Sequence, residues 1–439
     1  MGKKGKYTIA ELFVGAGGSH VGFKSAEFKT VYVEDFDEDM IKAFKLNNPE
    51  IPKEIIDSRA VQKVKAKDIL EKAGIEKGQL DVLFGGIVCI GFSLAGVRDP
   101  SDPSNTLYKH YLRIVKGILP KICIIENVPG MKNFKILDSK ADEKLKDEVS
   151  KIYQRLEDFK GIKAKRRKEG KDLGPKEKKE YERVKKKRRS LSKKVNENSV
   201  NVVENIEDVF KDLGYNVNQK ILNAGWYGAA TTRERLIIVA THKKLKEHFC
   251  FPTIKYWKEA GSREKIMEKM NNKVPKEMIA KKFKKFKTVQ EAFEKMDLVG
   301  VNNPEKDKEN VPMNHKKKTV RRFSYIPRGK NIVEVMEKVP ENLKISKYYS
   351  RGCTMRLDPN KPSPTLVPGH SNFPVHPNED RSITVREAAV ITGFPIDYKF
   401  YGNHTQRCRQ VGNAVPPPLA KALAEKAKEM LARYYKRRS

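Results

Sequence analysis

The sequence predicts an α/β protein in which helices cover both faces of a parallel sheet. Short apolar segments, typical of buried strands, alternate with segments of helical periodicity along the first part of the chain. Glycine or charged residues follow these apolar segments, at the places where strands would end. Ligands of such sheets bind beyond the carboxyl ends of the strands. The fold class therefore also predicts where a functional site lies.

The expected elements can be given in chain order. A glycine loop and a short helix follow the first strand, and acidic residues end the second. The expected strands are 8–14, 29–37, a strand ending at Asp68–Ile69, 81–88, 121–128, 216–224 and one within 231–240. The expected helices beyond the first are 39–48, 202–215, 385–395 and 412–434, the last with Pro416–Pro418 at its start, where missing N–H groups are tolerated.

The composition changes at two places along the chain. Residues 140–199 contain 23 Lys and Arg against 12 Asp and Glu, and a heptad series of apolar residues at 145, 149, 152, 156 and 159 predicts a helix. A weaker second series follows a turn at 170–175, so we expect an inserted, Lys-rich helical hairpin. Its role stays open between a solvated spacer and a clamp on phosphates. From 246 to 385 the pattern becomes irregular, which indicates a second domain. We expect 1–245 to form the first domain and 386–439 to return to it.

The formal net charge of +35 favours a polyanionic partner, with nucleic acid first. A lysine-rich proteome would also raise the charge without any partner. The five cysteines form no CxxC pair, so neither a disulfide framework nor a metal site is expected. The first residues lack the apolar core of a signal peptide, and no stretch is apolar for long enough to span a membrane. We expect a cytoplasmic, nucleoid-associated protein, monomeric because its charge is self-repelling.

The ends of the first three expected strands indicate a cofactor that contains adenosine. The loop FVGAGG lets the backbone approach a ligand closely. Asp35 is placed to accept hydrogen bonds from ribose hydroxyls, and Phe36 could stack on an adenine. Asp68 and Ile69 complete the set. These residues do not choose between NAD and S-adenosylmethionine, although the loop is not the GxGxxG of dinucleotide folds.

The stretch GGIVCIGFS places Cys89 on a loop beyond a strand, where a thiol can touch a ligand. Glu126 and Asn127 end the next strand. A thiolate is a good nucleophile and a carboxyl group can donate a proton. Together they suit attack on C6 of a cytosine whose N3 is protonated, after which C5 can accept a methyl group. Arg233 and Arg235 could hold O2 of the base and a phosphate, and the base must leave the duplex to be reached.

The motifs ELFVGAGG, DF, KDI, the Cys loop, ENV, RER, VREAA and GNAVPP occur in one order, and with them the chain resembles the C5-cytosine DNA methyltransferase family over nearly its whole length. The resemblance implies a Rossmann-like S-adenosylmethionine-dependent domain and a smaller, irregular target recognition domain at 246–385, with 386–439 completing the catalytic domain. It also implies methyl transfer to C5 of a flipped-out cytosine in a short duplex DNA sequence, through a covalent Cys89–C6 intermediate. Restriction–modification is the expected setting.

The resemblance assigns roles residue by residue. The implied catalytic residues are Cys89, Glu126, Asn127, Arg233 and Arg235. The implied cofactor-binding residues are Phe13, Gly15, Ala16, Gly17, Gly18, Asp35, Phe36, Asp68, Ile69, Leu107, Asn413 and Ala414. The implied DNA-binding residues are Ser93, Arg98, Thr365 and Leu366.

The chain departs from the family pattern near the chemistry. Pro-Pro-Cys-Gln is replaced by residues 87–90, Ile-Val-Cys-Ile, and the Pro-Gln before the arginines is replaced by Ala230-Thr231. A proline would stiffen the loop by fixing φ. Two alternatives stay open: a tRNA cytosine-5 methyltransferase, and a catalytically weakened protein that binds cofactor and DNA. The length of the 246–385 region favours DNA over tRNA.

Overall fold

The structure of the chain is a computed structural model. It describes residues 7–87, 100, 102–138, 140–168, 170–262, 275–296, 305–345, 352–369 and 373–438. Three residues to which the sequence assigns roles, Cys89, Ser93 and Arg98, lie outside the described residues.

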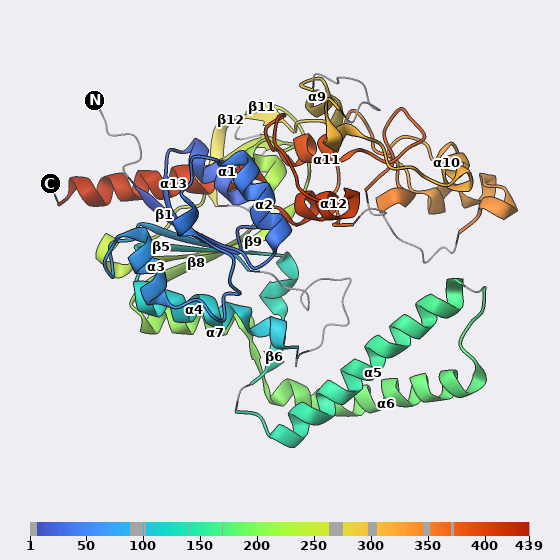
Figure 1. Cartoon of the computed structure of the whole chain (residues 1–439), viewed down its shortest axis with the longest axis horizontal. Coiled ribbons are helices and arrows are strands. Elements are labelled where there is room, and N and C mark those ends of the chain that lie inside the picture. The colour runs from blue at the N-terminus through green and yellow to red at the C-terminus, as the bar shows by residue number, and fades with distance from the viewer. Residues whose placement is uncertain are drawn as a thin grey trace.

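A seven-stranded sheet with the order β3-β2-β1-β4-β5-β9-β8 forms the centre of the protein (Figure 1). Its strands are β1 (Thr8–Leu12), β2 (Lys29–Glu34), β3 (Ile56–Asp57), β4 (Val82–Gly86), β5 (Ile122–Asn127), β8 (Tyr215–Asn223) and β9 (Glu234–His242). Pairing is parallel from β3 to β5, whereas β9 is antiparallel to both β5 and β8. A short connection joins β8 to β9 and needs no crossover helix. The α/β, Rossmann-like fold class is confirmed, but the sheet is mixed rather than wholly parallel.

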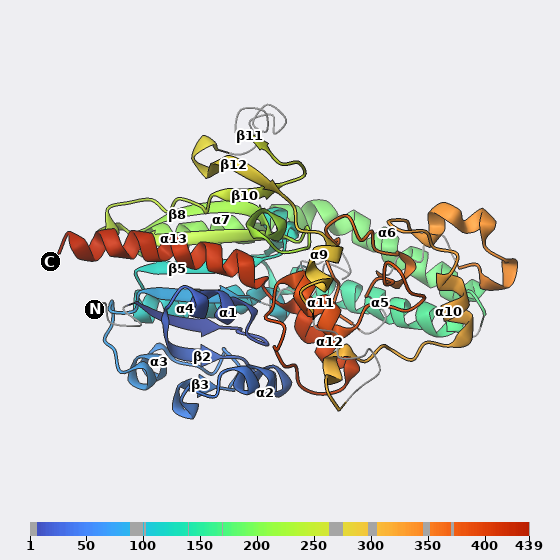
Figure 2. The same cartoon turned by 90° about the horizontal axis from the view of Figure 1, so that it is seen from above.

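Helices cover both faces of the sheet (Figures 1 and 2). On one face α1 (Gly18–Ser25) packs against α13 (Pro417–Lys436), although they lie at opposite ends of the sequence. The other face is covered by α3 (Ala66–Ala73), α4 (Leu107–Ile118) and α7 (Val202–Asp212). The helix α2 (Glu38–Asn47) follows β2. The end of the chain therefore returns to complete the core begun by its first residues.

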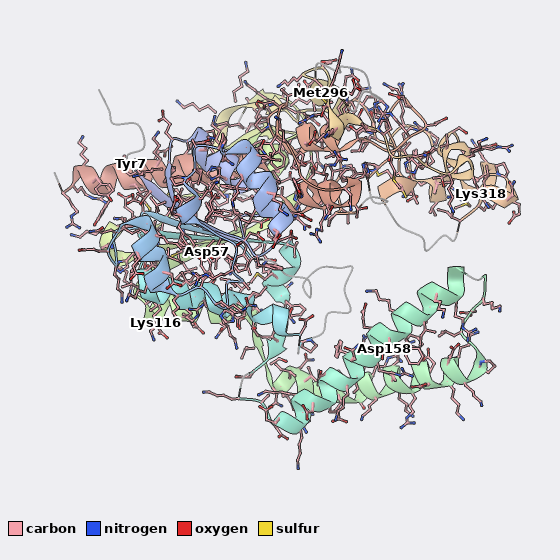
Figure 3. All side chains as sticks on the ribbon, viewed as in Figure 1. Tyr7, Asp57, Lys116, Asp158, Met296 and Lys318 are labelled. Carbon is pink, nitrogen blue, oxygen red and sulfur yellow. The ribbon has the colours of Figure 1, made fainter. Side chains whose placement is uncertain are left out.

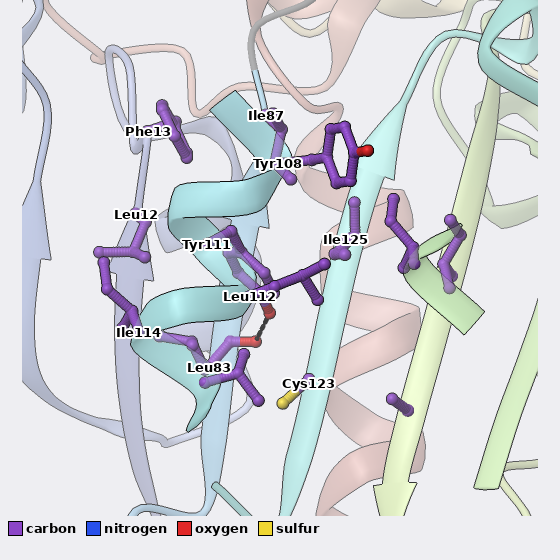
Figure 4. Close-up of a cluster of buried hydrophobic side chains, with 14 of the residues drawn as sticks. Leu12, Phe13, Leu83, Ile87, Tyr108, Tyr111, Leu112, Ile114, Cys123 and Ile125 are labelled. Atoms are coloured by element: carbon purple, nitrogen blue, oxygen red, sulfur yellow. Dashed lines mark hydrogen bonds between the residues drawn. The ribbon is translucent and has the colours of Figure 1, made fainter. Parts of the chain in front are cut away.

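The strand β4, which leads to residue 89, packs against α4. In Figure 4 the side chain of Tyr111, on α4, reaches Leu83 on β4, and its hydroxyl donates to the carbonyl oxygen of Leu83 at 2.9 Å. A Cβ atom at Gly85 would lie 2.6 Å from the Tyr111 ring, so glycine is needed for this packing. Cys123 is buried on β5. These contacts fix where β4 ends.

The prediction that Asp68 and Ile69 end a strand is wrong. Both residues lie in the first turn of α3, and the strand at this place is the short β3, which ends at Asp57. The Asp68 carboxylate accepts from the N–H of Lys65 at the start of α3. Lys65, the N-cap residue of α3, is not one of the usual N-cap residues, so the sequence before Asp68 gives no clear signal that a helix begins there.

The inserted hairpin is present as α5 (Glu143–Lys168) and α6 (Pro175–Glu197), which pack together. A two-stranded ribbon of β6 (Lys135–Leu137) and β7 (Ser199–Asn201) joins it to the sheet domain. The five heptad residues of α5 are all buried. In Figures 1 and 2 the hairpin extends from the same end of the sheet domain as the region around α10 and α12.

The region after β9 contains short elements and loops. Its sheet has the order β10-β12-β11, and its elements are β10 (Ile254–Trp257), β11 (Gly261–Ser262), β12 (Ile279–Lys285), α9 (Val289–Phe293) and α10 (Lys317–Phe323). Two further helices, α11 (Val385–Thr392) and α12 (His404–Asn413), lead to α13. Helix α12 was not predicted as a separate element. Within the described part of the chain, no helix has the length and apolarity to cross a membrane.

Candidate active site

The carboxyl ends of three adjacent strands meet at Gly86. A Cβ atom built on this glycine would lie 3.4 Å from the carbonyl oxygen of Phe13 and 3.8 Å from Oε2 of Glu126. Phe13 follows β1 and Glu126 belongs to β5, so Gly86 on β4 lies between them. The glycine loop, the carboxylate and the start of the segment that carries Cys89 are thus neighbours at one edge of the sheet.

The glycine loop needs glycine for backbone conformation at Gly15 and Gly17, and for space at Gly18, where an added Cβ would lie 2.4 Å from the carbonyl oxygen of Val415. Gly15 has φ +58° and Gly17 has φ +92°, both in the left-handed region. A Cβ atom at Gly17 would lie 2.5 Å from the Tyr398 hydroxyl, which donates to the carbonyl oxygen of Ala16 at 2.5 Å. At Gly15, by contrast, an added Cβ would meet nothing within 4 Å. The loop is therefore packed from behind at Gly17 and open at Gly15.

Asp35 binds the glycine loop from the end of β2. Its carboxylate accepts from the N–H of Gly15 at 2.8 Å and from the N–H of Asp37 at 2.9 Å. Burial raises the pKa of Asp35 to about 6, although the two N–H groups act in the opposite direction. The neighbouring Phe36 is 59% exposed, which is unusual for so large an apolar side chain and leaves its ring free to stack.

The other proposed cofactor residues differ in accessibility. Asp68 accepts from Arg59 at 2.8 Å, and this guanidinium holds the pKa of Asp68 below its usual range. Ile69 is fully buried, so a ligand could reach it only through its backbone. Leu107 begins α4 and is half-buried. The last two residues of the proposed cofactor set, Asn413 and Ala414, lie much later in the chain, beyond α11.

Asn413 ends α12 and is exposed, whereas Ala414 is buried against the first turn of α1. A Cβ atom at Gly18 would lie 3.1 Å from the Cβ of Ala414. The structure thus brings this late segment to the glycine loop.

Glu126 forms a buried ion pair with Arg235. The Nε atom of Arg235 lies 2.7 Å from Oε1 of Glu126, and both side chains are 9% exposed. Arg235 also donates from Nη1 to the carbonyl oxygen of Glu234 at 2.6 Å. Burial lowers the pKa of Arg235, and the Glu126 carboxylate opposes this shift. Arg235 therefore orients one oxygen of Glu126, while Oε2 lies on the side of Gly86.

Asn127 links β5 to the beginning of the Cys89 segment. Its Nδ2 atom donates to the carbonyl oxygen of Ile87 at 3.2 Å, and its Oδ1 atom accepts from the N–H of Val128 at 2.7 Å. The side chain is buried. This geometry makes Asn127 a residue that positions the chain just before Cys89.

Arg233 is directed toward a different partner from Arg235. It is buried, and its Nη1 atom donates to the carbonyl oxygen of Leu366 at 3.1 Å. Burial, together with the charge of Arg235, lowers the pKa of Arg233 well below its usual range. Leu366 has a buried side chain and Thr365 an exposed one. Of the two DNA-binding predictions at this place, only Thr365 presents its side chain to solvent.

The residues at 230 and 231 extend the same junction. Ser363 donates its N–H to the carbonyl oxygen of Ala230 at 2.8 Å, and Thr231 Oγ1 donates to the carbonyl oxygen of Pro364 at 3.1 Å. The N–H of Ala230 donates to the carbonyl oxygen of Ile391 at 3.0 Å. A proline at 230 could not make this last bond. The replacement of Pro-Gln by Ala230-Thr231 therefore allows a backbone hydrogen bond that a proline would prevent.

Sequence reasoning missed a buried polar cluster beneath the glycine loop. Glu11, inside β1, accepts from Ser19 at 2.7 Å and lies 2.7 Å from Nδ1 of His20. Tyr398 was also missed. The sequence did contain a signal for the Glu11 cluster, because a carboxylate within an apolar strand requires polar partners. Nothing local in the sequence connects Tyr398 to residues 16 and 17.

No group of three or more His, Cys, Asp or Glu residues in the described ranges could hold a metal ion. The strand order and the polar residues at one edge of the sheet define an α/β protein of the Rossmann-like class. The sequence pattern of the C-5 cytosine-specific DNA methylase family matches residues 7–160 and 189–429. The chain belongs to this family.

Curated relatives cover nearly all of the chain. The Type II methyltransferase M.DdeI of Desulfomicrobium norvegicum is 27% identical over 95% of this chain and 88% of its own length. The Type II methyltransferase M.Eco47II of Escherichia coli is 25% identical over 98% of this chain and 81% of its own length.

Solved structures share the fold. A DNA modification methyltransferase encoded within an E. coli prophage has a TM-score of 0.59 at 21% identity, covering 97% of this chain and 100% of that chain. The S. pombe Dnmt2 methyltransferase has a TM-score of 0.51 at 13% identity, covering 97% and 99%.

Proposed function

We propose that the protein methylates C5 of a cytosine in a specific short sequence of duplex DNA, with S-adenosylmethionine as the methyl donor. The observation that carries the proposal is the Glu126–Arg235 pair beside Gly86, at the edge of the sheet where the glycine loop ends. Family membership supports the same reaction, and the relatives named above are Type II methyltransferases.

The residues at the glycine loop fit an adenosine-containing cofactor. The open space beside Gly15 leaves room for a ligand, the Asp35 carboxylate can accept from ribose hydroxyls, and the exposed Phe36 ring can stack on adenine. The remaining members of the set are Phe13, Ala16, Gly17, Gly18, Asp68, Ile69, Leu107, Asn413 and Ala414. When bound, S-adenosylmethionine supplies the methyl group.

The reaction assigns separate tasks to the protein side chains. Cys89, as the thiolate, bonds to C6 of the flipped-out cytosine. Glu126 supplies a proton or a hydrogen bond to N3, which draws electrons from C6 and makes the attack possible. Arg235 holds Glu126 in place and can reach O2 of the base. After transfer, the C5 proton passes to water and the electron pair of that C–H bond forms the C5–C6 double bond as the Cys89 thiolate leaves C6. The N3 proton returns to Glu126, so the enzyme is restored.

Binding of DNA is assigned to the segments on either side of this edge. Residues 1–245 with 386–439 would form the catalytic domain and 246–385 the target recognition domain. Arg233 connects the two through Leu366, and Thr365, Ser93 and Arg98 would contact the duplex. The net charge of +35 supports a polyanionic substrate.

Nucleoside mass spectrometry tests the proposal. DNA and tRNA from cells that express the wild type are compared with those from cells that express Cys89→Ala. We expect 5-methylcytosine in the DNA of wild-type cells alone. Methylation of tRNA only would make RNA the substrate, and a product made by Cys89→Ala would refute the covalent mechanism. Absence of product from a folded, cofactor-binding wild type would identify a weakened binding protein.

A further inference from the structure

The helix α6 carries basic side chains that the protein itself does not neutralise. Of its residues, 11 are Lys or Arg and 4 are Glu. Lys178, Lys185 and Lys187 form ion pairs with Asp172, Glu182 and Glu148. Eight others have no acidic partner among the described residues: Lys176, Lys179, Arg183, Lys186, Arg188, Arg189, Lys193 and Lys194.

Three of these unpaired lysines form a straight row. Lys179, Lys186 and Lys193 are spaced seven residues apart and all are exposed. On a helix of 3.6 residues per turn, this spacing puts them on one face. Val184, Leu191 and Val195, which are half-buried in the contact with α5, lie on the opposite face. We call the row of Lys179, Lys186 and Lys193 the lysine stripe. It points away from the helix that α6 packs against.

The hairpin leaves the fold close to the candidate site. It starts from β6, shortly after Glu126 and Asn127, and its side chains project into solvent on both helices (Figure 3). The N–H of Leu137 in β6 donates to the carbonyl oxygen of Pro100 at 3.2 Å, so the base of the hairpin also holds the chain that follows the Cys89 segment. The family pattern matches residues 7–160 and 189–429, so the tip of the hairpin lies outside it.

We propose that the lysine stripe of α6 binds the phosphate backbone of duplex DNA beside the target cytosine. The proposal rests on the proposed function, since it takes the same DNA as the partner. A helix of 23 residues is about 34 Å long, close to one turn of B-DNA. Duplex DNA carries a charge about every 1.7 Å, which suits a row of lysines and requires no particular base. Phosphate contacts of this kind add affinity without adding sequence specificity.

The test compares two triple variants that remove the same charge. Lys179→Gln/Lys186→Gln/Lys193→Gln removes the stripe, whereas Lys178→Gln/Lys185→Gln/Lys187→Gln removes three ion-paired lysines of the same helix. All six side chains are solvent-accessible, and thermal unfolding verifies that both variants fold. Binding to a long duplex is measured over a range of salt concentrations with the full chain, and methylation of the same duplex is measured beside it.

Each phosphate contact contributes about 0.9 to the slope of log affinity against log salt. We expect the stripe variant to lower the magnitude of the slope by about 2 to 3, and the ion-paired variant to change it by less than about 1. Equal changes in both variants, or no change in the stripe variant, would overturn the proposal. If the wild type methylates DNA and the stripe variant has the same salt slope as the wild type, the role of the lysine stripe is refuted and the proposed function is not affected. A wild type that binds no duplex would refute the proposed function as well.

Discussion

The Nε atom of Arg235 lies 2.7 Å from Oε1 of Glu126, inside the protein and next to the end of β4. Removing one partner of a buried ion pair leaves an uncompensated charge, which costs about 3–5 kcal/mol of stability. Removing both partners costs less, because neither member of the pair is then left as an unpaired buried charge.

Glu126→Gln is expected to lower both stability and methyl transfer. The free energy of unfolding should fall by about 3 kcal/mol, and Glu126→Gln/Arg235→Gln should recover part of it. Activity should not recover, since the double variant has no proton donor for N3. Denaturant unfolding and methylation assays measure the two effects. Equal stability in the single and double variants would show that the loss in Glu126→Gln does not come from an unpaired Arg235 charge.

The pH dependence of cofactor binding should report on Asp35. Above its pKa of about 6 the carboxyl group of Asp35 is ionised and would be a strong acceptor for a ribose hydroxyl, whereas below pH 6 it is protonated and a weaker acceptor. Affinity for S-adenosylmethionine should therefore fall as the pH is lowered through 6. Asp35→Asn should bind more weakly and show a flatter profile in calorimetry. Burial and the charge of Asp35 raise the pKa of Glu34 to about 8, so Asp35→Asn should also lower the pKa of Glu34, and only the change in affinity around pH 6 reports on Asp35 itself.

Gly17→Ala is expected to disturb the glycine loop more than Gly15→Ala. Both positions have positive φ, which costs alanine about 1–2 kcal/mol. Only at Gly17 would the new Cβ also meet the Tyr398 hydroxyl, at 2.5 Å. Tyr398→Phe removes that oxygen and should rescue part of the Gly17→Ala loss in cofactor affinity and melting temperature. The same change should leave Gly15→Ala unimproved, and rescue of both would contradict the contact.

Arg233→Lys should weaken the junction between β9 and the segment at 363–366. A lysine has no fork with which to keep the contact to the Leu366 carbonyl oxygen, and a hydrogen bond from a charged donor is worth about 1.5–3 kcal/mol. Hydrogen exchange at 363–366 should become faster, and DNA affinity should fall with cofactor affinity unchanged. Unchanged exchange in this segment would show that the contact does not hold the two regions together.

The edge of the sheet that carries the site follows from the sequence, because Asp35, Glu126 and the glycine loop each end an apolar strand. The heptad series in α5 likewise identifies the hairpin. The antiparallel β9 could not be predicted in this way, since the pattern of one strand does not show the direction of its neighbour. Asp68 was misplaced because a short helix after a polar segment resembles the end of a strand.

Other features depend on contacts between distant parts of the chain. Tyr398 meets Ala16 across more than 380 residues, and Arg233 meets Leu366 across 133 residues. Local propensity and spacing contain no information about such pairs. The buried side chain of Leu366, which the resemblance assigned to DNA, is another example, because burial is decided by packing against residues elsewhere.

The proposed reaction depends on a covalent bond between Cys89 and C6 of a cytosine in DNA. A long duplex that contains 5-fluorocytosine at every cytosine position tests it directly, because fluorine at C5 cannot be lost as a proton is. In the presence of S-adenosylmethionine, the wild type should give a denaturation-resistant complex with this duplex, and peptide mass spectrometry should locate the linkage at Cys89. Cys89→Ala should give none. A complex linked through another residue, or one that forms equally well with Cys89→Ala, would refute Cys89 as the nucleophile.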